Sequence, residues 1–219
     1  MRHLTLVVVL ALGAAACAAG QGADGPVPDG GVPTPVASEQ VTPPEPAVSA
    51  TTPASEPPDA PPALGADASV RTRQTAGFPD GGGQVALLRA VRTARQDGFD
   101  RVVWAFDGDL PAYRVAYVDG PVTEDGSGDE IAVRGDAFLQ IVLTPASGTD
   151  LSGEEIRTVY TGPTRIDGSD TGTVTVQEVV ETGDFEATLS WAVGVTHEAP
   201  FTVTELADPT RVVVDVAHR

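Results

Sequence analysis

The stretch FDRVVWAFDG, residues 99–108, alternates two kinds of side chain with a period of two. One side of the extended chain carries three large apolar residues, Val102, Trp104 and Phe106. Because successive side chains of a β-strand point to opposite faces, this spacing is typical of a strand that packs one face on a core. We therefore predict a strand here, with Trp104 in the core and Arg101 on a face that is exposed to solvent or lies at a sheet edge.

The same period recurs in six further segments along the chain. They are rich in Val, Thr and aromatic residues, and turn sequences such as DG, GD and GS bound them. The segments are AYRVAYVDG (112–120), FLQIVLTP (138–145), TVTVQEVV (173–180), ATLSWAVGV (187–195), FTVTEL (201–206) and RVVVDVAH (211–218). About seven to nine short strands with frequent turns predict an all-β fold, an antiparallel β-sandwich of two small sheets.

Two other segments carry weaker patterns. QVALLRAVRTARQ (84–96) tolerates a helix, but its glycine-rich lead-in and the following Asp97–Gly98 turn favour a strand that forms a hairpin with 99–108. DLSGEEIRTVY (150–160) begins like a helix, and we expect a single helical turn there.

The composition narrows the range of partners. The formal net charge is -18, and all 13 basic residues are arginine. An acidic chain of this kind repels phosphate backbones, so we expect no nucleic-acid partner. The absence of lysine fits a high-GC coding bias, with selection for high salt as the alternative.

The N-terminus has the three parts of a signal peptide. Residues 1–3 carry positive charge, residues 4–12 are apolar except for Thr5, and small residues 13–16 lead to Cys17. The apolar run is too short for a spanning helix, which needs about 20 residues. We interpret residues 1–16 as a lipoprotein signal peptide.

Cys17 is the single cysteine of the chain. Small residues that run into a cysteine resemble a bacterial lipobox, although Ala14 stands where that pattern usually has leucine. The resemblance implies lipid attachment at Cys17, and the two chains of a diacylglyceryl group would hold the protein at the extracytoplasmic face of the cell membrane. The alternative is ordinary secretion, with cleavage at an A-x-A site within 14–16 and an unmodified Cys17.

The amino-acid composition changes after the cysteine. Residues 18–67 hold 12 of the 19 prolines and contain no aromatic residue and no arginine. Such a segment cannot bury enough apolar surface to offset its chain entropy. We predict that residues 17–67 form the lipid anchor and a disordered Pro/Ala/Thr-rich linker, and that 68–219 form the β domain. A proline-rich docking ligand is the alternative role for the linker.

Catalytic and metal-binding motifs are weak. His3 belongs to the signal peptide, His197 and His218 have no G-x-S-x-G partner, and no second cysteine exists for a zinc site. The acidic segments 124–130 and 167–172 lack the glycine and glutamate positions of a calcium loop. We therefore expect no enzyme activity, no metal and no cofactor. An enzyme that uses paired carboxylates remains an alternative, although short strands leave little room for a deep cleft.

Aromatic and basic side chains on the strands offer a candidate ligand surface. The four candidates are Arg101, Tyr113, Arg114 and Tyr117. Tyrosine and arginine on a flat strand surface can stack on sugar rings and hydrogen-bond to hydroxyls or carboxylates. The alternative is that both tyrosines cap the sandwich core.

Three segments resemble the AMIN-like domain of bacterial lipoproteins: DGFDRVVWAFDGDLPAYRVAYVD, GDFEATLSWAVGV and DPTRVVVDV. The resemblance covers about residues 84–218. The family is named for its similarity to the AMIN domain, which occurs at the N-termini of periplasmic cell-wall amidases and in pilus secretins. AMIN domains are β-sandwiches of two small sheets that target proteins to the envelope, in the amidases through peptidoglycan.

The resemblance implies a noncatalytic, membrane-anchored envelope lipoprotein that binds peptidoglycan or an associated wall component, as glycan or peptide. The alternative function is a scaffold for envelope protein–protein interactions, because an exposed strand edge can add to the sheet of a partner.

Overall fold

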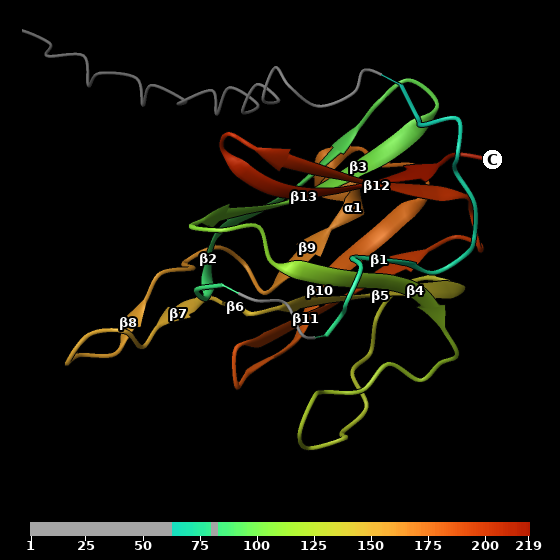
Figure 1. Cartoon of the computed structure of the whole chain (residues 1–219). Coiled ribbons are helices and arrows are strands. Elements are labelled where there is room, and N and C mark those ends of the chain that lie inside the picture. Colours follow the sequence, from blue (N-terminus) through green and yellow to red (C-terminus); the bar gives the residue numbers. More distant parts are fainter. Residues whose placement is uncertain (1–62, 80–82) are drawn as a thin grey trace, which may run out of the picture. The chain divides into compact units, whose positions relative to one another are not determined.

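The computed structural model describes residues 63–79 and 83–219 (Figure 1). The predicted signal peptide 1–16, Cys17 and the linker up to residue 62 lie outside the described residues. Within the described part of the chain, no helix is long and apolar enough to cross a membrane.

Two β-sheets form the domain, as predicted. The first has five strands in the order β12 (Phe201–Ala207), β13 (Thr210–Ala217), β3 (Phe99–Asp107), β2 (Ala86–Arg95) and β6 (Ala146–Ser147). The second has six strands in the order β1 (Arg73–Gln74), β4 (Ala112–Val118), β5 (Ala137–Thr144), β11 (Thr188–Val195), β10 (Val176–Phe185) and β9 (Arg165–Asp167). All neighbours pair antiparallel except β6, which runs parallel to β2. A small ribbon of β7 (Thr149–Asp150) and β8 (Arg157–Thr158) projects beside β6 (Figure 1).

The core lies between the two sheets and confirms the predicted alternation. Trp104 of β3 and Trp191 of β11 meet edge to face, with ring centroids 6.4 Å apart. Fully buried aliphatic residues from both sheets surround them, among them Val102, Leu139, Ile141, Leu143, Val212, Val214 and Val216. Burial of these apolar faces is the main driving force for the fold.

The two ambiguous segments both form strands. Residues 86–95 are strand β2, and Gly98 in the following turn takes a φ of +86°, as the predicted hairpin requires. The helical turn predicted within 150–160 is wrong. The Asp150 carboxylate accepts hydrogen bonds from the Ser152 amide and hydroxyl and pairs with Arg157, so the segment closes on itself as the β7–β8 ribbon.

A single-turn helix, α1 (Gly168–Thr171), is the one helix of the described residues, and it lies in the acidic segment 167–172. Asp167 caps it by accepting a hydrogen bond from the Ser169 amide, and Gly172 ends it at a φ of +71°.

A buried carboxylate fastens the two sheets together at one end of the sandwich. Asp100 of β3 has no exposed surface, and its Oδ2 accepts three hydrogen bonds of 2.6–2.9 Å from the amides of residues 174–176, at the start of β10. Its Oδ1 lies 2.9 Å from Nε2 of His218. We call this the closed end, defined by Asp100, residues 174–176 and His218.

Candidate functional site

The structure does not bring the four predicted ligand residues together. Tyr113 and Tyr117 point from β4 into the sandwich, while Arg114 points from the same strand to the outside. Arg101 lies on the other sheet, on the face of β3 that points away from the Trp104 core. No single surface can therefore use all four side chains.

The prediction that Arg101 is exposed is wrong. Its side chain is 2% exposed, and two of its nitrogens bind the Asp215 carboxylate at 2.6 and 2.8 Å. The guanidinium also lies 5.2 Å from the centre of the Phe99 ring. The antiparallel register places Asp215 of β13 directly opposite Arg101, so this arginine joins neighbouring strands and is not available as a surface contact.

Both tyrosines cap the core, as the alternative interpretation held. Tyr113 is almost fully buried, and burial, followed by the nearby charge of Glu205, raises its pKa to about 12. The Tyr117 hydroxyl donates to the Ala199 carbonyl at 2.7 Å and accepts from the Ala199 amide at 2.8 Å. Burial raises the Tyr117 pKa to about 12 as well. These hydroxyls therefore serve the fold.

Arg114 is the predicted ligand residue that remains at the surface. It is exposed on the outer face of the six-stranded sheet, and it forms no ion pair with any described residue. The strand register sets four partly or fully exposed neighbours on the same face: Gln74, Phe138, Gln140 and Val142. We call these five residues the Arg114 face. It combines a guanidinium and two amides, which bind hydroxyls and carboxylates, with an aromatic ring.

The loop between β4 and β5 covers part of the same sheet face over β9, β10 and β11. The Asp125 amide, in the loop between β4 and β5, donates to the Thr182 carbonyl of β10 at 2.8 Å. Further along the same loop, Arg134 binds Asp167 at 2.5 Å, and its amide donates to Glu178 at 2.9 Å. The Arg134 hydrogen bond is the largest cause that lowers the Asp167 pKa to about 2.

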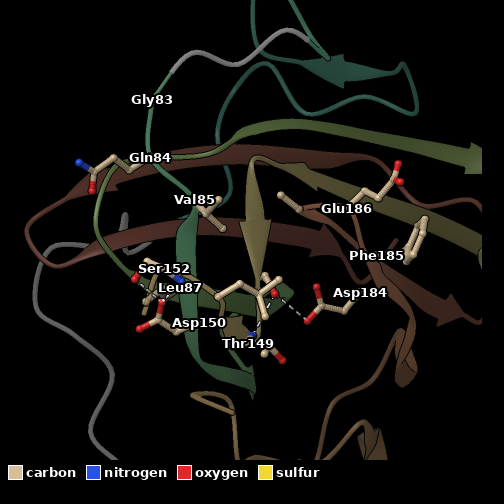
Figure 2. A pocket seen from close by; sticks show the side chains of 13 residues that line it. Gly83, Gln84, Val85, Leu87, Thr149, Asp150, Ser152, Asp184, Phe185 and Glu186 are labelled. Carbon is tan, nitrogen blue, oxygen red and sulfur yellow. Dashed lines mark hydrogen bonds between the residues drawn. The ribbon is translucent and has the colours of Figure 1, made fainter. Parts of the chain in front are cut away.

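A cleft of about 930 Å³ opens at the other end of the sandwich (Figure 2). We call it the open-end cleft. Three segments line it: Gly83, Gln84, Val85 and Leu87 before and within β2; Ser147, Thr149, Asp150, Leu151 and Ser152 around β6 and β7; and Asp184, Phe185, Glu186 and Ala187 at the β10–β11 turn. Its volume lies in the range of small-molecule sites.

Apolar side chains are exposed around this cleft. Phe185 and Leu151 are each 68% exposed, and Val85 is 41% exposed. Ile156, on the loop between β7 and β8, is 78% exposed. Two further large apolar residues among the described ones, Val70 and Val174, are exposed elsewhere. A gathering of exposed apolar groups around a concave surface is typical of a binding site.

The charged groups of the cleft are all acidic. Asp150 is paired with Arg157, and Ser152 and Arg157 hold the pKa of Asp150 well below its usual range. Among the described residues, Asp184 accepts hydrogen bonds through Oδ2 only, from the Ser147 hydroxyl at 3.0 Å and the Gly148 amide at 2.8 Å. Neither Asp184 nor Glu186 forms an ion pair with a described residue, so the lining has two uncompensated carboxylates.

The turn beside the cleft has an unusual backbone. Glu186 and Ala187 join β10 to β11 and take φ values of +50° and +58°. Such two-residue turns normally use Asn-Gly, because residues with a Cβ are strained at positive φ. The Ala187 carbonyl accepts a hydrogen bond of 2.8 Å from the Ala146 amide, which ties the turn to β6. Sequence reasoning missed this site, because it predicted a strand from residue 187 and so did not identify this two-residue turn.

Within the described residues, no group of three or more His, Cys, Asp or Glu side chains is placed to hold a metal ion. Comparison with family models matches residues 86–218 to the AMIN-like domain. The match begins with β2 and runs past the end of β13, so it includes most of the open-end cleft and every residue of the Arg114 face except Gln74 of β1. No curated protein and no solved structure showed significant similarity to the chain.

Proposed function

Since this chain belongs to the AMIN-like domain family, whose domains are generally noncatalytic and related to the cell wall, we propose that it binds peptidoglycan or an associated wall component without acting on it. The observation that carries the proposal is the Arg114 face. It is a sheet surface with two amides, an aromatic ring and a guanidinium that forms no ion pair with a described residue. Those groups suit an extended polymer of sugars and short peptides, which offers hydroxyls, carboxylates and the apolar faces of sugar rings.

The overall charge supports sugar or peptide as the bound part of the wall. A chain with a net charge of -18 is repelled by anionic wall polymers. Arg114 supplies a local positive charge for single carboxylates, while the amides of Gln74 and Gln140 bind neutral groups.

A pull-down with purified cell-wall sacculi tests this proposal. We expect the purified full-length protein to sediment with sacculi at physiological salt, and Arg114→Ala to reduce the retained fraction about tenfold, because it removes the unpaired cation of the face. Arg92→Ala is the matched control, since Arg92 is an exposed arginine on the other sheet. Retention of the wild-type protein no higher than that of an unrelated acidic protein would refute wall binding, and equal losses in the two variants would refute the Arg114 face.

We also propose that the protein is a lipoprotein held at the extracytoplasmic face of the cell membrane. The proposal rests on the signal-peptide pattern of residues 1–16, the lipobox-like position of Cys17 and the proline-rich segment that follows. A spacer of this length reaches on the order of 155 Å when fully extended, enough to place the domain within a wall layer.

Replacement of the cysteine tests the anchor. Cys17→Ala removes the thiol that would carry the lipid, so we expect the protein to move from the membrane fraction to the soluble extracytoplasmic fraction. Immunoblots of both fractions measure the change. A variant that stays in the membrane fraction to the same extent as the wild type would rule out lipid anchoring at this residue.

A scaffold for envelope proteins is the second candidate function, and the open-end cleft is the observation that favours it. Exposed apolar groups and unpaired carboxylates in one concavity are features of a protein-interaction site rather than of a sugar-binding surface.

A further inference from the structure

We infer that the open-end cleft binds a cationic polypeptide segment, one that carries arginine or lysine next to an apolar side chain. The inference rests on the scaffold function and does not depend on wall binding, because the cleft and the Arg114 face have no residue in common. Three observations on the described residues carry it: the sign of the charge, the exposed apolar groups and the size of the cleft.

The charge of the lining selects the sign of the partner. The lining holds Asp150, Asp184 and Glu186 and no basic residue, and Arg157 neutralises only the first of these. Asp184 is fixed in place by Ser147 and Gly148, which bind one of its oxygens and leave the other without a hydrogen-bond partner among the described residues. The carboxylate is held in a fixed orientation, so its second oxygen can accept a hydrogen bond from an ammonium or a guanidinium group. Anionic lipids and anionic polymers would be repelled.

The exposed apolar groups favour a partner that carries an apolar side chain as well as a positive charge. Phe185 and Leu151 expose most of their side chains, and each is adjacent in sequence to a lining carboxylate, Asp184 and Asp150 respectively. The face of an exposed aromatic ring can also hold a cation. Burial of these side chains against a partner would remove apolar surface from water, which a free metal ion or a small amine cannot do.

The size and shape of the cleft favour a peptide segment over a single side chain. About 930 Å³ is far more than one arginine or lysine head group fills. Figure 2 shows Phe185 and Glu186 across the cleft from Gln84 and Ser152, with Asp150 and Asp184 on either side of Thr149. Carboxylates therefore stand at separate points along the lining, so one segment can place two cations and an apolar residue between them.

The strained turn keeps these groups in position. Glu186 and Ala187 hold positive φ values, and the bond from the Ala146 amide to the Ala187 carbonyl anchors the turn on β6. Phe185 and Glu186 are thereby presented on a firmly tied turn, which lowers the entropy that a partner must remove on binding.

Fluorescence anisotropy with two labelled peptides tests the inference on the full-length protein. The probe alternates arginine and leucine over five residues, and the comparison peptide has glutamate in place of arginine. We expect the arginine peptide to bind and the glutamate peptide to show no binding, with the affinity of the former falling as salt rises. Failure of the arginine peptide to bind at millimolar protein would overturn the proposal.

Two sets of variants locate the site. Asp184→Asn with Glu186→Gln removes both uncompensated charges while an acceptor oxygen stays at position 184, and we expect binding about tenfold weaker with a smaller salt dependence. Phe185→Ser changes a side chain that is already mostly exposed, and we expect a weakening of about fivefold or more. Glu154→Gln with Glu155→Gln is the matched control, because it removes two exposed charges from the neighbouring loop that do not line the cleft.

The outcomes separate this proposal from its competitors. Equal losses in the cleft and control variants would overturn the cleft as the binding site. A concentration-dependent dimer in sedimentation that Phe185→Ser abolishes would overturn it in favour of a second copy of this chain as the occupant. If the protein binds the arginine peptide but is not retained by sacculi, wall binding is refuted and this proposal stands. If sacculi retain the protein but the peptide does not bind, this proposal is refuted and wall binding stands.

Discussion

An aspartate stands at each end of the sandwich, and the two carboxylates are used differently. At the closed end Asp100 is fully buried, and both of its oxygens are engaged, by three amides of residues 174–176 and by His218. At the open end Asp184 engages one oxygen, with Ser147 and Gly148, and the other oxygen is free of described partners. The same residue type therefore fastens two sheets where both carboxylate oxygens have partners, and leaves an acceptor for a ligand where one oxygen has none among the described residues.

The turns at the two ends also differ, in the residues that they place at positive φ. At the closed end the β2–β3 turn puts a glycine, Gly98, at the positive φ that the chain needs there. At the open end the β10–β11 turn puts Glu186 and Ala187 at positive φ, where a Cβ is strained. The closed end thus follows local preferences, while the open end carries local strain beside a cleft, as binding sites often do.

The largest effect that we predict is on the closed-end carboxylate. Asp100→Asn replaces the charged, buried acceptor of three amides by a neutral one, so we expect the free energy of unfolding to fall by about 2–4 kcal/mol. Urea denaturation followed by tryptophan fluorescence measures it. Asp184→Asn at the open end is the matched control and should cost no more than about 1 kcal/mol. A loss at position 184 as large as that at position 100 would break the comparison.

The second prediction concerns stability at alkaline pH. It tests whether the core near the open end is packed as tightly as the remainder of the core. Burial raises the pKa values of all three tyrosines to about 12: Tyr113, Tyr117 and, near the cleft, Tyr160. An unfolded chain releases these protons near pH 10, while the folded chain keeps them, so the stabilisation is complete below pH 10 and is lost as pH rises towards 12. Absorbance of tyrosinate should show no tyrosine titrating near pH 10. If one tyrosine does titrate near pH 10 and a Tyr160→Phe variant assigns it to Tyr160, the core near the open end is loosely packed.

The smallest predicted effect is a gain in stability at the strained turn. Glu186→Asn together with Ala187→Gly supplies the residues that a two-residue hairpin with positive φ prefers, so we expect about 1–2 kcal/mol of added stability. Thermal and urea denaturation measure it. At the closed end, Gly98→Ala should lower the stability, because a residue with a Cβ is strained at a φ of +86°. No atom lies near the added Cβ, so this effect comes from the backbone alone. A turn variant that leaves stability unchanged would mean that the strain is compensated elsewhere.

The strands and their inner faces could be predicted from local pattern alone. The period of two in 99–108 assigned Trp104 to the core, and the structure buries it completely. The same pattern placed Arg114 on a solvent face, where it lies. Sequence motifs also identified the family over nearly the residues that the family model matches. These features depend on neighbours along one strand, which the sequence contains directly.

Other features depend on which strands become neighbours. Arg101 and Asp215 are 114 positions apart, and only the register of β3 against β13 sets them opposite each other. The segment 150–160 has helix-like residues, but the Asp150–Arg157 pair closes it into a ribbon. In the first case the register buries an arginine that the strand pattern placed at the surface. In the second, the Asp150 carboxylate forms hydrogen bonds with Ser152 where the local pattern indicated a helical turn.

The sequence by itself determined an all-β domain, the composition of its core, its family and the outward position of Arg114, because alternating burial is written residue by residue along each strand. Only the tertiary structure decided that Arg101 belongs to the fold, that Asp100 joins the two sheets and that three distant segments enclose an acidic, apolar cleft. Each of these requires groups far apart in the chain to meet at hydrogen-bonding distance, and that meeting is set by sheet order and register rather than by any local pattern.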